Sequence, residues 1–142
     1  MRIEPLSKLD LGEIKALLTE NNLPVEDISG KVEFFGIKNQ QQLNGVVGLE
    51  IFPETALLRS LVVADGKKGT GLGKKLCSYA LNYLQGKKVK KVFLLTTTAK
   101  PFFIDLGFTE TERGKVPEEI INTTEFASVC PASADCLMME LS

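Results

Sequence analysis

The amino-acid sequence predicts a single α/β domain built on one mixed β-sheet with helices on its faces. Residues 45–52 and 56–64 are apolar, strand-like segments joined by a short turn, which is typical of an antiparallel hairpin. Residues 56–64, 71–84 and 89–97 then alternate strand, helix and strand, which requires a parallel pair with a right-handed crossover. With 142 residues, 44% of them hydrophobic, we expect one domain with one core.

The first half of the chain predicts a helix followed by an antiparallel meander. Asp10 and Glu13 have the spacing of a capping box, so a helix should begin there. Its apolar residues recur at helical spacing and should share a buried face; they are Ile14, Leu17 and Leu18. The elements expected in this half are a strand at 1–4, the helix as far as 21–22, a helical turn at 25–29, a strand at 32–38, a polar loop at 39–42 and the hairpin.

The second half is expected to alternate helices with strands. The helix at 71–84 should bury Leu72, Leu76, Ala80 and Tyr83 against the sheet. The lysines between 87 and 91 are typical of an exposed turn and strand edge. The remaining elements are a strand at 89–97, a short helix at 100–106, an antiparallel strand at 108–113, a helical turn at 117–122 and a closing strand at 136–141.

Composition narrows the functional classes. A formal net charge of −1 lacks the basic excess of a nucleic-acid-binding protein. We expect a cytoplasmic protein without a membrane partner, because the amino terminus has no apolar signal region and no apolar run is long enough to span a bilayer. Three cysteines favour reduced thiols over a disulfide framework. Without histidine there is no imidazole base, and we expect no metal site.

The segment at 65–75 predicts a binding site for a diphosphate. Gly69, Gly71 and Gly73 let the backbone turn tightly and approach a ligand closely. The first amides of the helix that follows have no intrahelical partner, and the helix dipole places partial positive charge at the same end. Four lysines raise the local potential further: Lys67, Lys68, Lys74 and Lys75.

Spacing separates this segment from two other phosphate-binding loops. A P-loop would need a glycine at position 68 and a hydroxyl residue at position 75, and both positions are lysine. A dinucleotide-binding loop would need glycine where Lys74 stands and an acidic residue about 20 residues further on, at the end of the next strand. The sequence therefore argues against both magnesium-nucleotide and dinucleotide binding.

Residues 68–73, Lys-Gly-Thr-Gly-Leu-Gly, resemble the pyrophosphate loop of the GNAT acyl-CoA N-acetyltransferases, with lysine where that family prefers glutamine or arginine. Residues 99–108, which end in Leu-Gly-Phe, are similar to a second motif of the same family. Residues 21–24, 96–99 and 125–136 further resemble the branch known as arsenic-resistance N-acetyltransferases. The resemblance covers nearly the whole chain and implies a GNAT-like domain over residues 1–142, with a splayed central sheet.

The resemblance also implies that acetyl-CoA is the cosubstrate and lies between two parallel strands that diverge. The backbone of Leu61 and Val63 would hold its pantetheine arm, and a strand N–H would stabilise the oxyanion by about 3 kcal/mol while the amine attacks directly. Thr96, where many relatives have asparagine, is a further candidate contact. The pyrophosphate would bind the loop residues Lys68, Gly69, Thr70, Gly71, Leu72 and Gly73.

Glu50 is the leading candidate for the base that accepts a proton from the acceptor amine. It stands alone among apolar neighbours on a predicted strand, which raises the proton affinity of a carboxylate toward the range a general base needs. The alternative is structural: a four-residue connection would place Glu50 opposite Arg59 as a cross-strand ion pair. Arg59 could instead bind a carboxylate or oxyanion of the acceptor through a bidentate contact.

Phe103 departs from the family pattern. Many relatives have a tyrosine at this place, and its phenol can protonate the departing thiolate. Phenylalanine cannot, so solvent or another hydroxyl such as Ser128 or Tyr79 must take that role, or turnover is slow or absent.

The tail suggests two further roles. The loop containing Ser128 and Cys130 could shape the acceptor pocket. Cys130 and Cys136 also suggest thiolate ligation of arsenic, because thiolates are soft ligands. The alternative is that these cysteines are small buried hydrophobic residues, as expected for Cys77 in the apolar helix.

Together these patterns predict an acetyl-CoA-dependent N-acetyltransferase that acts on a small amine, such as an amino acid analogue or an organoarsenical. A non-catalytic acyl-CoA-binding module and an acetyltransferase for protein amino groups remain as alternatives. An exposed final strand could pair across a two-fold axis to form a homodimer.

Overall fold

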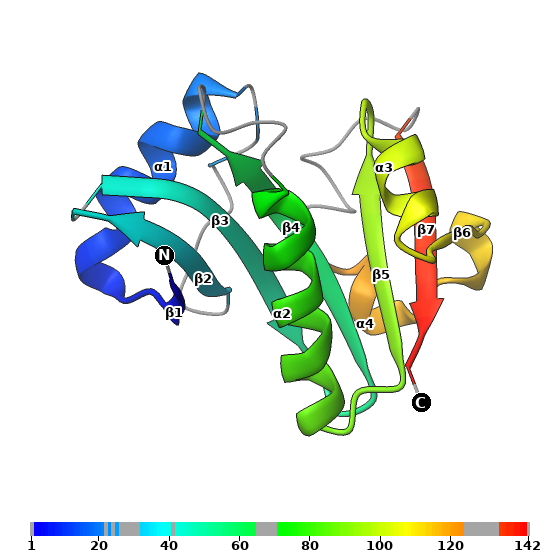
Figure 1. Cartoon of the computed structure of the whole chain (residues 1–142). Coiled ribbons are helices and arrows are strands. Elements are labelled where there is room, and N and C mark those ends of the chain that lie inside the picture. The colour runs from blue at the N-terminus through cyan, green and yellow to red at the C-terminus, as the bar shows by residue number, and fades with distance from the viewer. Residues whose placement is uncertain are drawn as a thin grey trace.

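Seven strands form one mixed sheet in the order β1-β2-β3-β4-β5-β7-β6 (Figure 1). The computed structural model describes residues 2–21, 23, 25, 32–40, 42–64, 71–123 and 134–141. Strands β4 and β5 run parallel, and the other neighbouring strands pair antiparallel. The strands are β1 (Arg2–Pro5), β2 (Glu33–Asn39), β3 (Gln42–Ile51), β4 (Thr55–Val63), β5 (Lys91–Thr96), β6 (Thr109–Glu110) and β7 (Asp135–Glu140).

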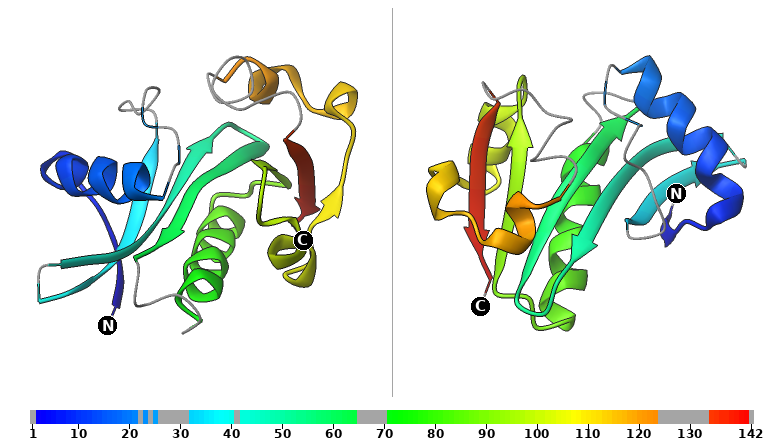
Figure 2. Two further views of the ribbon diagram at one scale, coloured as in Figure 1. Left: turned by 90° about the horizontal axis from the view of Figure 1, so that it is seen from above. Right: turned by 180° about the vertical axis from the view of Figure 1, so that it is seen from behind.

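Helices cover both faces of this sheet (Figure 2). On one face, α2 and α3 pack with the buried side chains of β2 to β5 in the largest core cluster. On the other face, α1 packs on β2, β3 and β4, while α4 packs on β4, β5 and β7. The helices are α1 (Leu11–Glu20), α2 (Leu72–Gly86), α3 (Lys100–Asp105) and α4 (Glu118–Ile121), with short 3-10 helices η1 (Lys8–Asp10) and η2 (Arg113–Lys115). The predicted fold class is confirmed.

Helix α2 buries most of its predicted face. Leu76, Ala80 and Leu84 recur every fourth residue and are fully buried, so they form one stripe against the sheet. Tyr83 was expected in that stripe, and this prediction is wrong. Its ring packs on Phe35 at a centroid distance of 4.8 Å, and its hydroxyl donates to Glu33 Oε1 at 2.9 Å, which keeps the polar tip near solvent.

The capping box lies one turn earlier than predicted. The amide of Leu9 donates to Ser7 Oγ at 3.2 Å, and the amide of Ser7 donates to Asp10 Oδ2 at 2.8 Å, so the box opens η1. Glu13 was expected to complete a box at the start of α1. Its carboxylate instead accepts from the amide of Leu43 on β3, at 3.3 Å.

Replacing Lys38 with methionine should make the free energy of unfolding depend less on pH in the acid range. The Lys38 ammonium donates to Asp10 Oδ1 at 2.6 Å, and this hydrogen bond, followed by the one from Ser7, lowers the pKa of Asp10. A carboxyl whose folded pKa is depressed stabilises the protein above its unfolded pKa of about 4, and this contribution is lost as the pH falls through the folded value.

Denaturant unfolding of wild type and Lys38→Met should therefore give free energies that differ near about pH 6 and converge below about pH 3. Lys90→Met serves as the control, because the Lys90 and Glu54 side chains are 71% and 69% exposed and their ion pair is open to screening by solvent. A difference between wild type and Lys38→Met that is independent of pH would contradict the expectation.

The carboxyl-terminal third departs from the predicted meander. The strand expected at 108–113 is limited to β6, and η2 follows it. The final strand pairs with β5 along its whole length, while β6 pairs with its residues Leu137 and Met138 on the other side. It is therefore not a free sheet edge. The other predicted strands match within a few residues, and the turn predicted at 25–29 lies outside the described residues apart from Val25.

Candidate functional site

The two parallel strands diverge part-way along their length. Their pairing runs from Thr55 with Lys91 to Leu57 with Phe93, and the described residues form no further β4–β5 pair. Strand β4 nevertheless continues to Val63 and β5 to Thr96. The strands separate toward the end at which α2 begins, as Figure 1 shows. Beyond Leu57 on β4 and Phe93 on β5, the described residues of the two strands are thus no longer paired with each other.

A bulge in β4 determines which backbone groups face this opening. Val47 of β3 lies opposite two residues of β4, Ser60 and Leu61. Before the bulge, Phe52 donates to the carbonyl of Thr55 at 2.9 Å, so the backbone groups of odd-numbered residues face β3. Beyond the bulge, Ala64 donates to the carbonyl of Asn44 at 2.8 Å, so even-numbered residues face β3. The bulge therefore turns Leu61 and Val63 toward the side on which β5 diverges.

Ser60 adopts a left-handed conformation at the bulge, with φ of 59°. For a residue with a Cβ this conformation costs on the order of 1–3 kcal/mol and persists only where neighbouring groups hold it. The serine hydroxyl accepts a hydrogen bond from Arg59 Nε at 3.2 Å.

The amino terminus of α2 lies next to the end of β4. A Cβ placed on Gly73 would lie 3.7 Å from Val63 Cγ2, so helix and strand ends are in contact. A helical bond runs from the amide of Lys75 to the carbonyl of Gly71, and among the described residues no side chain caps the helix. The amides of residues 71–74 therefore lack intrahelical acceptors.

Gly71 has the geometry expected of a residue beside a ligand. Its φ is 84°, which favours glycine, and a Cβ placed there would meet no non-neighbouring atom of the described residues within 4 Å. Leu72 is buried, so only its backbone can contact a ligand. Of the predicted loop residues, Lys68, Gly69 and Thr70 lie outside the described residues.

Glu50 and Arg59 lie on the sheet face opposite α2, between the clusters formed by α1 and α4. Arg59 Nη1 donates to Glu50 Oε2 at 3.2 Å, and the two side chains are 1% and 13% exposed. The prediction that Glu50 and Arg59 lie directly opposite each other on the two strands is wrong. The turn is tighter than the assumed four residues, so Glu50 pairs with Leu57 and Arg59 with Gly48, and the ion pair runs diagonally.

Helix α4 covers part of the sheet face on which Glu50 lies. Thr55 Oγ1 donates to Glu119 Oε2 at 2.9 Å, and Ile120 packs on Leu57 and Phe93. Cys136 belongs to the same apolar cluster, and its burial raises the pKa of its thiol, although Arg113 opposes the shift. Among the described residues no group of three acidic, cysteine or histidine side chains could hold a metal ion. Ser128 and Cys130 lie outside them.

Phe103 and Thr96 have local structural partners. The Phe103 ring is 6% exposed and packs edge-on against Phe102 and Phe108, at centroid distances of 5.1 and 5.6 Å. The Thr96 hydroxyl accepts from the amide of Ala99 at 3.0 Å, just before α3. Its predicted contact with a cofactor stays a prediction.

Tyr79 and Cys77 of α2 both belong to the core on the sheet face that α2 covers. The Tyr79 ring packs on Phe35 of β2, which β3 and β4 separate from β5. Cys77 is fully buried among apolar neighbours, and this burial raises its pKa to about 12, so it remains a neutral thiol.

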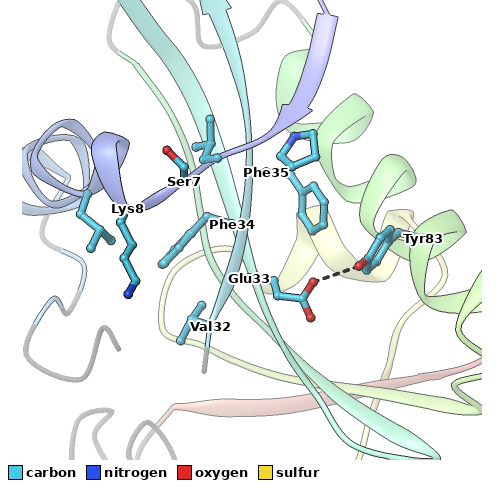
Figure 3. A pocket seen from close by; sticks show the side chains of 10 residues that line it. Ser7, Lys8, Val32, Glu33, Phe34, Phe35 and Tyr83 are labelled. Atoms are coloured by element: carbon cyan, nitrogen blue, oxygen red, sulfur yellow. Dashed lines mark hydrogen bonds between the residues drawn. The ribbon is translucent and has the colours of Figure 1, made fainter. Parts of the chain in front are cut away.

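A cavity of about 420 Å³ lies near the edge of the sheet formed by β1 and β2, at the point where the chain leaves β1 (Figure 3). Phe34 and Phe35 form part of its wall, and the hydrogen bond between Tyr83 and Glu33 lies along it. Among the described residues, none of those predicted to bind acetyl-CoA or the acceptor lines this cavity.

The family model for the acetyltransferase (GNAT) domain matches residues 30–110, more than half of the 142-residue chain. This chain belongs to the GNAT acetyltransferase family. It is an acetyl-CoA-dependent N-acetyltransferase, with acetyl-CoA as its cosubstrate. The residues present fit that cosubstrate, because the diverging strands of this GNAT domain and the uncapped end of α2 lie side by side.

Solved GNAT structures share this fold. Rv2747 from Mycobacterium tuberculosis, crystallised with CoA, is 19% identical with a TM-score of 0.78, and 100% of each chain is covered. N-acetylglutamate synthase from Neisseria gonorrhoeae, crystallised with CoA and L-arginine, is 18% identical with a TM-score of 0.80, covering 99% of this chain and 33% of that one. The ribosomal-protein-S18-alanine N-acetyltransferase from Escherichia coli is 16% identical with a TM-score of 0.73, covering 99% and 92%.

Sequence reasoning missed two features of this GNAT domain. The bulge at Ser60 carried no signal, because a left-handed position is usually marked by glycine or asparagine. The bond between Thr55 and Glu119 joins residues too far apart in the chain for local patterns to reveal. In the part of the chain that the structure describes, no helix is long and apolar enough to cross a membrane.

Proposed function

We propose that this enzyme transfers the acetyl group of acetyl-CoA directly to the amine of a small molecule. The observation that carries the proposal is the position of Glu50, a partly exposed carboxylate on the sheet face that α1 and α4 flank. It lies on β3, beside the strand whose bulge turns backbone groups toward the opening. A proton acceptor and amide donors thus lie on adjacent strands.

The backbone of this chain supplies the cosubstrate site. Leu61 and Val63 would hydrogen-bond the pantetheine arm, because the bulge turns their backbone groups away from β3. The amides of Gly71, Leu72 and Gly73 would bind the diphosphate, with Lys68, Gly69 and Thr70 completing the loop. Thr96 would contact the cosubstrate from β5.

In the proposed reaction the amine nitrogen attacks the thioester carbonyl and Glu50 accepts the amine proton, directly or through one water. A backbone N–H near the bulge stabilises the developing oxyanion by about 3 kcal/mol. The carbon–sulfur bond then breaks, the amide product forms, and the thiolate leaves. Phe103 has no proton to supply, so the thiolate takes one from solvent.

The resemblance to the arsenic-resistance branch supports an amino acid analogue or an organoarsenical as the acceptor. Ser128 and Cys130 are proposed to line its site, since both stand in the segment that carries the resemblance. Arg59 is proposed to act on the acceptor through Glu50, because its side chain is only 1% exposed and already contacts that carboxylate. The proposed partner is therefore a small amine, and no role is assigned to nucleic acid or membrane.

Release of free thiol from acetyl-CoA in the presence of an amine panel tests this proposal. The panel should contain amino acid analogues, an organoarsenical amine, an aminoglycoside and a peptide with an amino-terminal alanine. We expect thiol release above the rate of hydrolysis with at least one small amine. Release with the peptide alone would replace the small-molecule acceptor by a protein amino group.

A thermal-shift measurement separates binding from turnover. Acetyl-CoA at about one hundred times its dissociation constant should add about 2.7 kcal/mol to the free energy of unfolding. Stabilisation without thiol release for any member of the panel would contradict the proposed transfer reaction.

A further inference from the structure

We infer that Arg59 is a positioning residue that couples the proton acceptor Glu50 to the bulge in β4. The inference rests on the proposed function, because Glu50 and the backbone groups beyond the bulge receive their roles there. It concerns a residue that lies between two parts of the site, for which the sequence left open either an ion pair with Glu50 or a contact with the acceptor.

The two ends of the Arg59 guanidinium group contact two different parts of the site. Nε donates to Ser60 Oγ at 3.2 Å, and Nη1 donates to Glu50 Oε2 at 3.2 Å. The group is planar and rigid, so fixing one of these contacts fixes the direction of the other. Because the side chain is only 1% exposed, an acceptor cannot reach the guanidinium without displacing what covers it.

The bulge needs such a contact because Ser60 is strained. Its φ of 59° is one that a residue with a Cβ rarely adopts unless its surroundings hold it there. Glycine would adopt this conformation without strain, but it has no hydroxyl to accept the bond from Arg59. The presence of serine at this position is therefore explained by the contact that its side chain makes.

The sheet also leaves space for the Arg59 side chain to reach Glu50 diagonally across the strands. The residue directly across from Arg59 is Gly48, which has no side chain to occupy the space between the strands. A Cβ on Gly48 would lie 2.9 Å from Phe34 Cε1 on the next strand, so a side chain here would require the Phe34 ring to shift. The guanidinium thus extends past Gly48 to the carboxylate two residues further along β3.

Coupling of this kind affects turnover more than acceptor affinity. Arg59→Lys keeps a positive charge beside Glu50 but loses the Nε donor, and Ser60→Ala loses the acceptor of the same bond. Each change should lower kcat about tenfold or more while the KM for the acceptor changes less than about threefold. Because both variants break one hydrogen bond, the double variant should be no worse than the poorer single variant.

Two comparisons keep the kinetic test specific. Lys90→Met, at an exposed ion pair at the other end of β5, should retain wild-type kcat. Ser60→Gly tolerates the left-handed φ and loses only the hydroxyl, so it should fold and still lose turnover. A raised acceptor KM with unchanged kcat, seen only for acceptors that carry a carboxylate, would show that Arg59 binds the acceptor directly and would overturn the inference.

Amide spectra test the coupling without turnover. In ¹⁵N-labelled protein, Arg59→Lys should raise the hydrogen-exchange rate of the Val62 amide, which lies just beyond the bulge on the side that pairs with Val46 of β3, while Lys90→Met should not. Unchanged exchange at Val62 would overturn the inference. If the wild-type protein releases no thiol with any amine, the proposed function fails, and these spectra still decide whether Arg59 holds the bulge.

Discussion

Glu50→Gln should lower kcat by about a hundredfold to ten-thousandfold, the range that a general base contributes. Glutamine has nearly the same shape as glutamate, and its carbonyl oxygen can still accept the hydrogen bond that Arg59 Nη1 donates. It cannot accept the proton of the attacking amine. The variant should therefore fold, and its affinity for acetyl-CoA should match the wild type, because the amides proposed to bind the cosubstrate lie on β4 and α2.

Steady-state kinetics at saturating acetyl-CoA, with calorimetric titration of acetyl-CoA, would measure both quantities. Glu54→Gln is the matched control, because Glu54 lies in the turn of the same hairpin with its side chain 69% exposed. That control should keep wild-type kcat. If Glu50→Gln retained kcat within about threefold, the proton would have to leave through another group or through water alone.

Gly71→Val should abolish measurable binding of acetyl-CoA. A Cβ at position 71 meets no non-neighbouring atom within 4 Å in the part of the chain that the structure describes, so the new side chain would enter the space proposed for the diphosphate. It also sits at a φ of 84°, which a β-branched residue disfavours, so the free helix amides would shift. We expect the dissociation constant to rise at least about a hundredfold in calorimetric titration, equivalent to about 2.7 kcal/mol.

Gly107→Val is the control for backbone strain, because it places the same side chain at another glycine with a positive φ that is not part of the proposed diphosphate site. Gly107 has a φ of 110°, and a Cβ there would lie 3.3 Å from the flexible end of Met139, so this variant is strained as well. It lies in the turn after α3 and is not among the residues proposed to bind the diphosphate. Both variants should lower the melting temperature, but only Gly71→Val should lose affinity for acetyl-CoA. If the two variants bound acetyl-CoA with equal affinity, the assignment of the diphosphate site to the start of α2 would be wrong.

These two substitutions act on different halves of the reaction. Gly71 belongs to the proposed cosubstrate site, where backbone amides do the binding and side chains contribute little. Glu50 belongs to the acceptor side, where one carboxylate carries the proposed chemistry. Arg59 lies between these two residues. Its contacts with both Ser60 and Glu50 indicate that one buried side chain positions the two halves of the site relative to each other.

Local patterns in the sequence were sufficient for the helices, most strands and the start of α2. The spacing of Leu72, Leu76 and Ala80 predicted the buried stripe of α2, because helical periodicity depends only on neighbouring residues. The glycines before Leu72 likewise predicted uncapped amides, because a helix start is a local property. The strand, helix and strand order of this region was enough to predict the parallel pair β4–β5.

Tertiary structure alone decided how these elements meet. The diagonal contact of Glu50 with Arg59, the bulge at Ser60 and the insertion of β7 between β5 and β6 all depend on pairing register. Register is set by the sum of many contacts between residues distant in the chain, so no short pattern contains it. Local patterns were enough to establish that a helix preceded by glycine follows a buried strand. Which amides turn toward the opening, and which side chain holds them there, depended on packing across the sheet.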